Sequence, residues 1–156
     1  MTVARGETLR AQPTLAHLDD AAIDRLAQHA TEVRFAVGEL VLEEGGDATV
    51  FYLVTSGRVS LEIHASGRGR LLVETIGPGG IVGWSWLFPP YRWHFDARAL
   101  EPVTALAFDG AAVRESAGSD PAFGYALLLG FSGVMLDRLQ STRVRLLDLY
   151  GHDDAR

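Results

Sequence analysis

Side chains able to do acid–base or metal chemistry are few and widely spaced in this sequence. There is no cysteine, which excludes thiol nucleophiles, thiolate metal sites and disulfides. Glu43 and Glu44 resemble a carboxylate pair, but the turn signal Gly45-Gly46 follows them, which favours solvated charges. The histidines form no pair at metal-ligand spacing; they are His17, His29, His64, His94 and His152. We therefore expect no metal, no cofactor and no enzymatic activity.

Aromatic side chains, in contrast, are concentrated in one short segment. A buried aromatic ring removes about 150–250 Å² from water, and at about 25 cal/mol per Å² this is several kcal/mol per ring. Three hypotheses follow: the rings fill the core, they line a pocket for a flat or apolar ligand, or they form an exposed anchor for a protein partner. The cluster consists of Trp84, Trp86, Phe88, Tyr91, Trp93 and Phe95.

Length and composition predict one soluble domain over residues 1–156, since 47 % of the residues are apolar. The net charge of -6 disfavours nucleic acid as a partner. The first residues lack the apolar stretch of a secretory signal, and the longest apolar segment, residues 122–136, is too short to span a bilayer. We expect a cytoplasmic protein with no membrane and no DNA partner.

The pattern of apolar residues and glycines predicts an α+β fold. Residues 18–30 have helical spacing, with Asp19 as the N-cap. From about 33 to 108, short apolar runs alternate with glycines, and Ser56-Gly57 separates two strand-like runs. These features indicate an antiparallel β-roll of the double-stranded jelly-roll type behind a short N-terminal helix.

The last part of the chain, about 109–150, is predicted to be helical. Pro121 suits a first helical turn behind Ser119 or Asp120, and Gly151 can end the helix. One apolar stripe contains Phe123, Leu127, Phe131 and Val134. A second stripe recurs at steps of three and four, which predicts a parallel homodimer seam. This seam consists of Tyr125, Leu128, Ser132, Met135, Leu139, Thr142, Leu146 and Leu149. The alternative is a helix folded back on its own domain.

One stretch carries a specific family resemblance. The segment GELVLEEGGDATVFYLVTSGRVSL, residues 38–61, resembles the signature of cyclic-nucleotide-binding domains, as in the catabolite-activator/FNR family of bacterial regulators. The matching residues include Gly38, Glu39, Gly45 and Gly57. The resemblance implies a β-roll with a long C-terminal dimerisation helix, on which Thr142 and Arg143 fall where the family's helix meets the base. Only six residues follow Tyr150, which leaves no room for a helix-turn-helix domain.

The family's phosphate-binding cassette corresponds to residues 82–99, and here its chemistry is absent. Gly83 and Ala97 match, but Trp84 occupies the position of the ribose-binding glutamate and Phe95 that of the phosphate-pairing arginine. Each lost contact is worth about 1.5–3 kcal/mol, so the loss of both weakens cyclic AMP binding by about a hundredfold or more. We therefore predict that cyclic AMP does not bind in the usual way.

Arg92 is the candidate replacement for the missing arginine. Alternation from Tyr91 to Ala99 predicts a strand with aromatic residues inward and the four polar residues Arg92, His94, Asp96 and Arg98 outward. If a loop continues through Trp93, Arg92 can turn inward. The candidate pocket is Gly83, Trp84, Ser85, Trp86, Arg92, Phe95, Ala97, Thr142 and Arg143.

The sequence thus predicts a non-catalytic, homodimeric regulatory or sensor protein. It would act through contacts with a protein partner or through a small apolar or aromatic ligand. The alternative is a genuine cyclic-nucleotide receptor that binds through backbone amides and Arg92.

Overall fold

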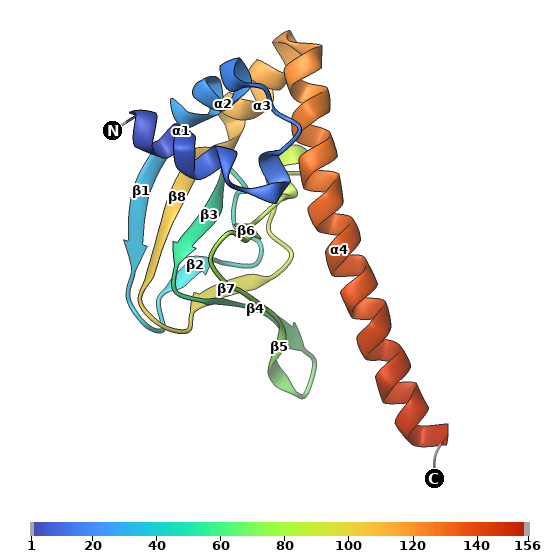
Figure 1. The fold of residues 1–156 in the computed structure, drawn as a ribbon. Coiled ribbons are helices and arrows are strands. Elements are labelled where there is room, and N and C mark those ends of the chain that lie inside the picture. Colours follow the sequence, from blue (N-terminus) through green and yellow to red (C-terminus); the bar gives the residue numbers. More distant parts are fainter. Residues whose placement is uncertain (1, 155–156) are drawn as a thin grey trace.

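A computed structural model describes residues 2–154 of the chain, with side chains described for residues 6–151. Two four-stranded antiparallel sheets form a β-roll, helices cover one end of it, and a long C-terminal helix runs beside it (Figure 1). One sheet has, in order, β1 (Ala30–Phe35), β8 (Val103–Asp109), β3 (Val50–Ser56) and β6 (Ile81–Val82). The other has β2 (Leu40–Leu42), β7 (Asp96–Ala99), β4 (Val59–Ala65) and β5 (Gly69–Ile76). The predicted α+β roll is therefore confirmed.

The turn between β3 and β4 lies where the sequence predicts it. Gly57 has a φ of 85°, a conformation that side-chain-bearing residues rarely adopt. A Cβ atom at this position would lie 2.3 Å from the carbonyl oxygen of Pro102. Glycine is therefore required here both by backbone conformation and by the close approach of the chain between β7 and β8.

The N-terminal part of the chain contains α1 (Thr2–Arg10), a short 3₁₀ helix, η1 (Pro13–Leu15), and α2 (Asp20–Ala27). The side chain of Asp19 accepts a hydrogen bond from the Ala22 amide, which confirms the predicted N-cap. Helix α1 was not anticipated, since its sequence has no apolar face to signal a helix.

Two helices follow the roll: α3 (Gly110–Ser119) and α4 (Pro121–Asp154). Asp120 caps α4, because its carboxylate accepts from the Phe123 amide at 3.4 Å. The predicted end at Gly151 is wrong, since α4 continues through it to Asp154. A glycine inside a helix costs only about 1 kcal/mol relative to alanine, and the chain makes no return turn there that would favour a stop.

The core lies between the two sheets and the start of α4. The ring of Phe51 stacks on Trp86 and on Phe108, with centroids 4.6 Å and 4.7 Å apart. The first apolar stripe of α4 covers these rings: Phe123, Leu127 and Phe131 are buried and Val134 is half-buried. This apolar stripe of α4 is therefore buried against the core, as the sequence predicts.

Helix α4 is longer than the apolar run that suggested it. By length and composition alone, residues 121–151 could cross a membrane, and 22 % of the most apolar window is buried inside the molecule. The expectation that this segment is too short is thus corrected, because the helix is continuous. The evidence for a membrane span is weak, since a helix that covers a core passes the same test.

Candidate functional site

A cavity of about 310 Å³ lies between the roll and the middle of α4. Strands β4 and β5, the segment between β6 and β7, and α4 each contribute side chains to its wall. The lining consists of Leu61, Ile63, Val73, Glu74, Trp84, His94, Phe95, Met135, Arg138, Leu139 and Thr142. Most of these side chains are apolar, so the cavity suits a ligand with a largely apolar surface.

Two aromatic side chains form one wall of this pocket. Trp84 follows β6 and precedes the short 3₁₀ helix η2 (Ser85–Leu87), and Phe95 directly precedes β7. Both rings are only half-buried, so they reach the cavity. The guanidinium carbon of Arg138 lies 4.6 Å from the centroid of the Trp84 ring, within range of a cation–π interaction.

Arg138 is the main charged group of the site, and sequence reasoning did not select it. Its side chain is only 12 % exposed; Nε lies 3.5 Å from Oε2 of Glu74, and Nη2 donates to the carbonyl oxygen of Ile81. Burial lowers the pKa of Arg138, and the nearby Glu74 carboxylate opposes this effect. The pair therefore brings one positive and one negative charge into the same wall.

Thr142 and His94 are the remaining polar groups of the lining. The hydroxyl of Thr142 donates to the carbonyl oxygen of Arg138, one turn earlier in α4, at 2.9 Å. Its oxygen still has lone-pair capacity to accept a hydrogen bond from a bound molecule.

A model of the family described as "cyclic nucleotide-binding domain" matches residues 32–120 of this chain, which is more than half of it. The chain belongs to the cyclic nucleotide-binding domain family. The residues that carried the resemblance in the sequence, 38–61, lie inside this match.

Two proteins similar to this cyclic nucleotide-binding domain come from bacteria. A CRP-like cAMP-activated global transcriptional regulator of Mycobacterium tuberculosis is 27 % identical over 132 residues. That match covers 85 % of this chain, which spans 57 % of the length of the relative. A cyclic nucleotide-binding protein from Geobacter metallireducens has a TM-score of 0.78 at 30 % identity, with coverage of 86 % of this chain and 97 % of that chain.

A more distant structure shows the same fold with another kind of ligand. The regulatory subunit of a cAMP-independent protein kinase A from Trypanosoma cruzi is described bound to guanosine. Its TM-score is 0.63 at 19 % identity, and the match covers 85 % of this chain and 53 % of that chain.

The pocket described above contains only part of the site predicted for this cyclic nucleotide-binding domain. Trp84, Phe95 and Thr142 line it. Ser85, Trp86 and Ala97 are buried and do not line it, and Arg143 is exposed on α4. The structure adds Glu74, His94 and Arg138, which lie far from the cassette in sequence or outside its pattern. Helical spacing offered one signal, because Arg138 lies three residues after Met135 and four before Thr142.

Arg92 lies away from the cavity. Its Nη1 forms an ion pair with Oδ1 of Asp47 at 2.8 Å and donates to the carbonyl oxygen of Gly45. The side chain is half exposed and does not contribute to the lining. The existing partners of Arg92 therefore hold it at the loop before β3, outside the cavity lining.

Gly83 retains the backbone conformation that the cassette match suggested, with a φ of 96°. The space beside it is filled, because a Cβ atom there would lie 2.7 Å from the Trp93 ring. Trp93 is itself buried. The indole of Trp93 therefore packs directly against Gly83, where a larger residue would not fit.

The predicted strand from Tyr91 to Ala99 is wrong in its first half. Strand β7 begins only at Asp96, and Tyr91 has a φ of 56°. Trp93 instead pairs with the Gly45-Gly46 turn: its carbonyl accepts from the Gly45 amide and its amide donates to Gly46. The alternation of aromatic residues is typical of a strand, but the left-handed conformation of Tyr91 and these turn contacts prevent strand pairing here.

Asp96 was predicted to point outward, and this prediction is wrong. It is buried, its Oδ1 accepts from the Glu44 amide at 2.8 Å, and its Oδ2 lies 3.2 Å from Nε2 of His64. The hydrogen bond from Glu44 is the main cause of a lowered pKa for Asp96; desolvation opposes it, and His64 and Arg98 add to it. The carboxylate holds β7 against the β2–β3 loop.

The six rings are divided between the core, the pocket wall and the surface. Trp86 and Trp93 are core residues, while Trp84 and Phe95 line the pocket. Phe88 is 46 % exposed. The ring of Tyr91 lies under the guanidinium of Arg114, 3.9 Å from its carbon to the centroid.

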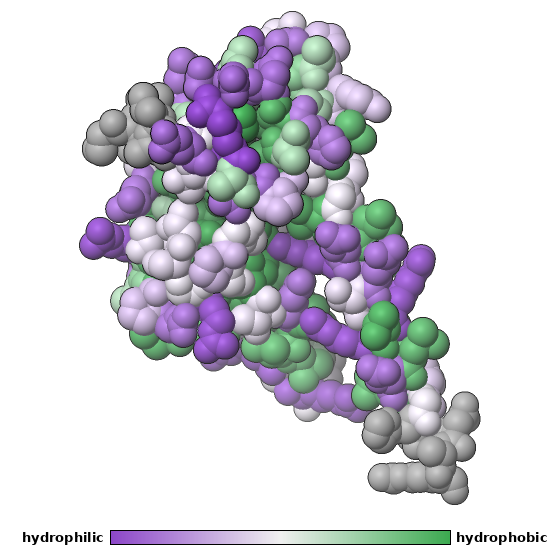
Figure 2. All heavy atoms as spheres, in the orientation of Figure 1, coloured by the Kyte–Doolittle hydropathy of each residue, from purple (hydrophilic) through white to green (hydrophobic). Residues whose placement is uncertain are grey.

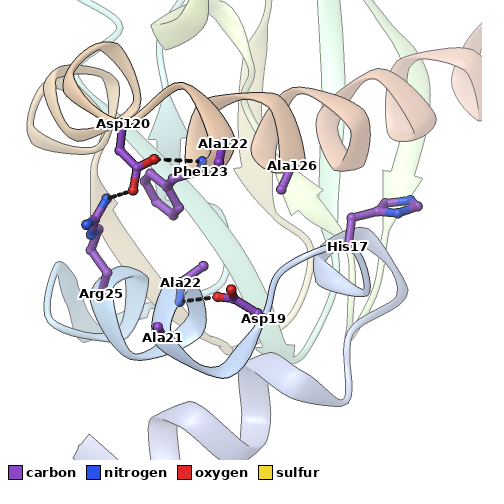
Figure 3. A pocket seen from close by; sticks show the side chains of 9 residues that line it. All are labelled: His17, Asp19, Ala21, Ala22, Arg25, Asp120, Ala122, Phe123 and Ala126. Carbon is purple, nitrogen blue, oxygen red and sulfur yellow. Dashed lines mark hydrogen bonds and ion pairs between the residues drawn. The ribbon is translucent and has the colours of Figure 1, made fainter.

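A smaller cavity, of about 230 Å³, lies between α2 and the start of α4 (Figure 3). At one end, Arg25 and Asp120 point toward each other and form an ion pair of 3.0 Å. Asp19 caps α2 at the other side, and His17 points away from this pair. The Arg25–Asp120 ion pair joins the two helices, which makes this a structural junction.

Metal ligands do not assemble anywhere in the described part of the chain. No group of three histidine or carboxylate side chains with suitable geometry occurs among the described residues. The side chain of His152 lies outside them.

Proposed function

We propose that this chain is a non-catalytic, ligand-sensing regulatory domain whose pocket takes a flat, largely apolar molecule in place of cyclic AMP. One observation carries the proposal: Trp84 and Phe95, which the sequence resemblance aligns with the family's ribose-binding and phosphate-pairing residues, both line the cavity. The Trypanosoma cruzi protein supports it, since a chain that contains the same fold is described bound to guanosine, a nucleoside without a phosphate.

The second part of the proposal concerns assembly and output. The outer stripe of α4 stays exposed along most of its length, including Leu128, Leu139, Leu146 and Leu149, while Met135 is half-buried. Apolar side chains of the lower part of this helix are visible in Figure 2. A parallel homodimer in a cytoplasmic protein would cover this seam. Because Thr142 and Leu139 belong to both pocket and seam, a ligand could influence contacts between the two copies and with a protein partner.

The comparisons do not support the expectation that DNA is not a partner. The Mycobacterium tuberculosis relatives are transcriptional regulators, and this chain spans 57 % of their length. The expected absence of a DNA partner therefore has no support from the comparisons and is not part of the proposal.

Calorimetric titration with cyclic AMP and cyclic GMP tests the proposal. We expect no binding at micromolar concentration, because the only guanidinium among the described lining residues is already paired with Glu74. Micromolar binding that Arg92→Ala abolishes would establish the alternative receptor and refute the proposal. Native mass spectrometry of protein purified from its host provides a direct search for a retained ligand.

A further inference from the structure

We infer that the Arg138–Glu74 pair makes this pocket selective for uncharged planar molecules over both anions and cations of the same shape. The inference rests on the proposed ligand-sensing function and names the chemical class of ligand.

The charges around the cavity carry the argument. Its described lining includes three titratable side chains, Glu74, His94 and Arg138. The 3.5 Å contact between Nε of Arg138 and Oε2 of Glu74 places opposite charges side by side in the same wall. An anion that approaches Arg138 also meets the Glu74 carboxylate, and a cation that approaches Glu74 meets the guanidinium. Each ion would therefore lose its hydration without gaining a free counter-charge.

The hydrogen-bonding groups of Arg138 are already occupied or inaccessible. Nη2 donates to the Ile81 carbonyl, and Nη1 is buried without a hydrogen-bond partner. The guanidinium also lies over the Trp84 ring. A ligand therefore cannot form the two-pronged contact with Arg138 that phosphates and carboxylates prefer unless the side chain leaves Glu74 and β6.

Other cations lie outside the cavity. Arg145 donates to the carbonyl oxygen of Val73, but its side chain is exposed and does not line the pocket. Arg143 is exposed on the same helix. Water and salt screen exposed charges, so these two residues contribute little to selection inside the cavity.

Size and shape agree with a small fused-ring molecule. A volume of about 310 Å³ is at the lower end of the usual range for ligand pockets, about 300–1,000 Å³. Trp84 and Phe95 offer aromatic surface, and Leu61, Ile63, Met135 and Leu139 offer aliphatic surface. The Thr142 hydroxyl provides an acceptor for one neutral polar group.

The test uses three probes with the same ring system and different charge: 2-naphthalenemethanol, 2-naphthoate and 2-naphthylmethylammonium. Calorimetry at pH 8 measures their affinities for the full chain. We expect the neutral alcohol to bind about tenfold or more tightly than either ion. Ile63→Trp, which fills the pocket from β4, should abolish this binding. Equal or tighter binding of an ion, or no binding of any probe at millimolar concentration, would overturn the inference.

Charge variants provide the sharper comparison. Glu74→Gln leaves Arg138 unpaired, so the ratio of naphthoate to alcohol affinity should rise about tenfold or more. Arg138→Met should shift the preference toward the ammonium probe. Glu32→Gln, an exposed change on β1, is the matched control and should leave all ratios unchanged. Circular dichroism verifies that each variant folds. If Arg138→Met does not fold, the result for Glu74→Gln alone tests the inference. An unchanged ratio in folded Glu74→Gln would overturn the inference.

The two proposals fail in different ways. Micromolar binding of cyclic AMP refutes the ligand-sensing function proposed above. A preference for charged naphthalene probes, with cyclic AMP still unbound, refutes only the selection by the ion pair.

Discussion

The two halves of α4 have the same secondary structure and opposite environments. From Pro121 to Phe131, one face of the helix packs on the core through Phe123, Leu127 and Phe131. Beyond Ser132, most side chains are exposed, and the helix contacts the roll through the pocket residues and through the arginines at positions 138 and 145. The upper half is therefore fixed by apolar burial, whereas the lower half depends on few polar contacts.

We therefore expect the upper half of α4 to contribute mainly to stability and the lower half mainly to binding and assembly. Apolar burial contributes about 1.5–3 kcal/mol per large side chain, so truncation of the buried side chains in the upper half should lower the free energy of unfolding. Apart from Arg138, whose side chain is 12 % exposed, the lower half makes mainly exposed contacts, which contribute little. Changes at its exposed positions should therefore alter binding and assembly while the fold remains.

The largest expected effect is the loss of stability in Phe131→Ala. Phe131 is fully buried and meets both Phe51 and Trp86 edge to face at 5.2 Å. Its truncation should lower the free energy of unfolding by about 3–5 kcal/mol. Leu147→Ala, at a side chain that is 71 % exposed, should change it by less than about 0.5 kcal/mol. Urea denaturation measures both, and similar values would remove the distinction between the two halves.

The next effect concerns assembly through the lower half. Leu149 lies in the predicted seam, whereas Leu147 is equally exposed and lies outside it. In a symmetric dimer, Leu149→Asp acts twice, so the dimer dissociation constant should rise about a hundredfold, or about 3 kcal/mol. Leu147→Asp should leave it within about threefold. Sedimentation of the unsubstituted chain as a monomer at micromolar concentration would contradict the seam.

Acid should weaken the roll through Asp96. Its pKa is lowered on folding, so its contribution to stability is present above the unfolded pKa of about 4 and is lost as the pH falls through the lower folded value. Asp96→Asn should cost about 1–2 kcal/mol at pH 7 and reduce the loss of stability in acid. Thermal unfolding between pH 7 and pH 3 measures this, and a steeper loss in the variant would contradict the assignment.

The smallest expected effect is at the junction that starts α4. Asp120→Ala removes the N-cap of α4 and the ion pair with Arg25. The cap is worth about 1 kcal/mol, and the half-exposed ion pair adds little. Asp137→Ala, an exposed position in the lower half, is the control and should be neutral within about 0.5 kcal/mol. Equal losses in the two variants would show that the cap is unimportant.

Local signals in the sequence predicted much of the fold. The N-cap Asp19, the Ser56-Gly57 turn and the buried stripe of α4 depend on spacing within a few residues, and each occurs in the structure as predicted. The strand from Tyr91 failed because alternation alone does not reveal a left-handed residue at that position. The end of α4 failed because a glycine permits a helix to stop but does not require it.

The site was harder to predict than the fold. Trp84, Phe95 and Thr142 were selected through the family resemblance and line the cavity. Glu74 and Arg138 were missed as a pair because their contact joins β5 to α4 across more than sixty residues; helical spacing indicated only that Arg138 lies near Met135 and Thr142. The charge of the pocket depends on this pair, so its chemistry becomes visible only when the roll and the helix are placed together.

Because α4 continues without a break past the pocket, its lower half extends well beyond the cavity. From Arg138 to Asp154 the helix extends by sixteen residues, or about 24 Å at about 1.5 Å per residue. A rigid rod of this length converts a tilt of about 10° at the cavity into a displacement of about 4 Å at its tip. Under the proposed ligand-sensing function, small differences in what fills the space beside Trp84 would be magnified at the C-terminal end of α4.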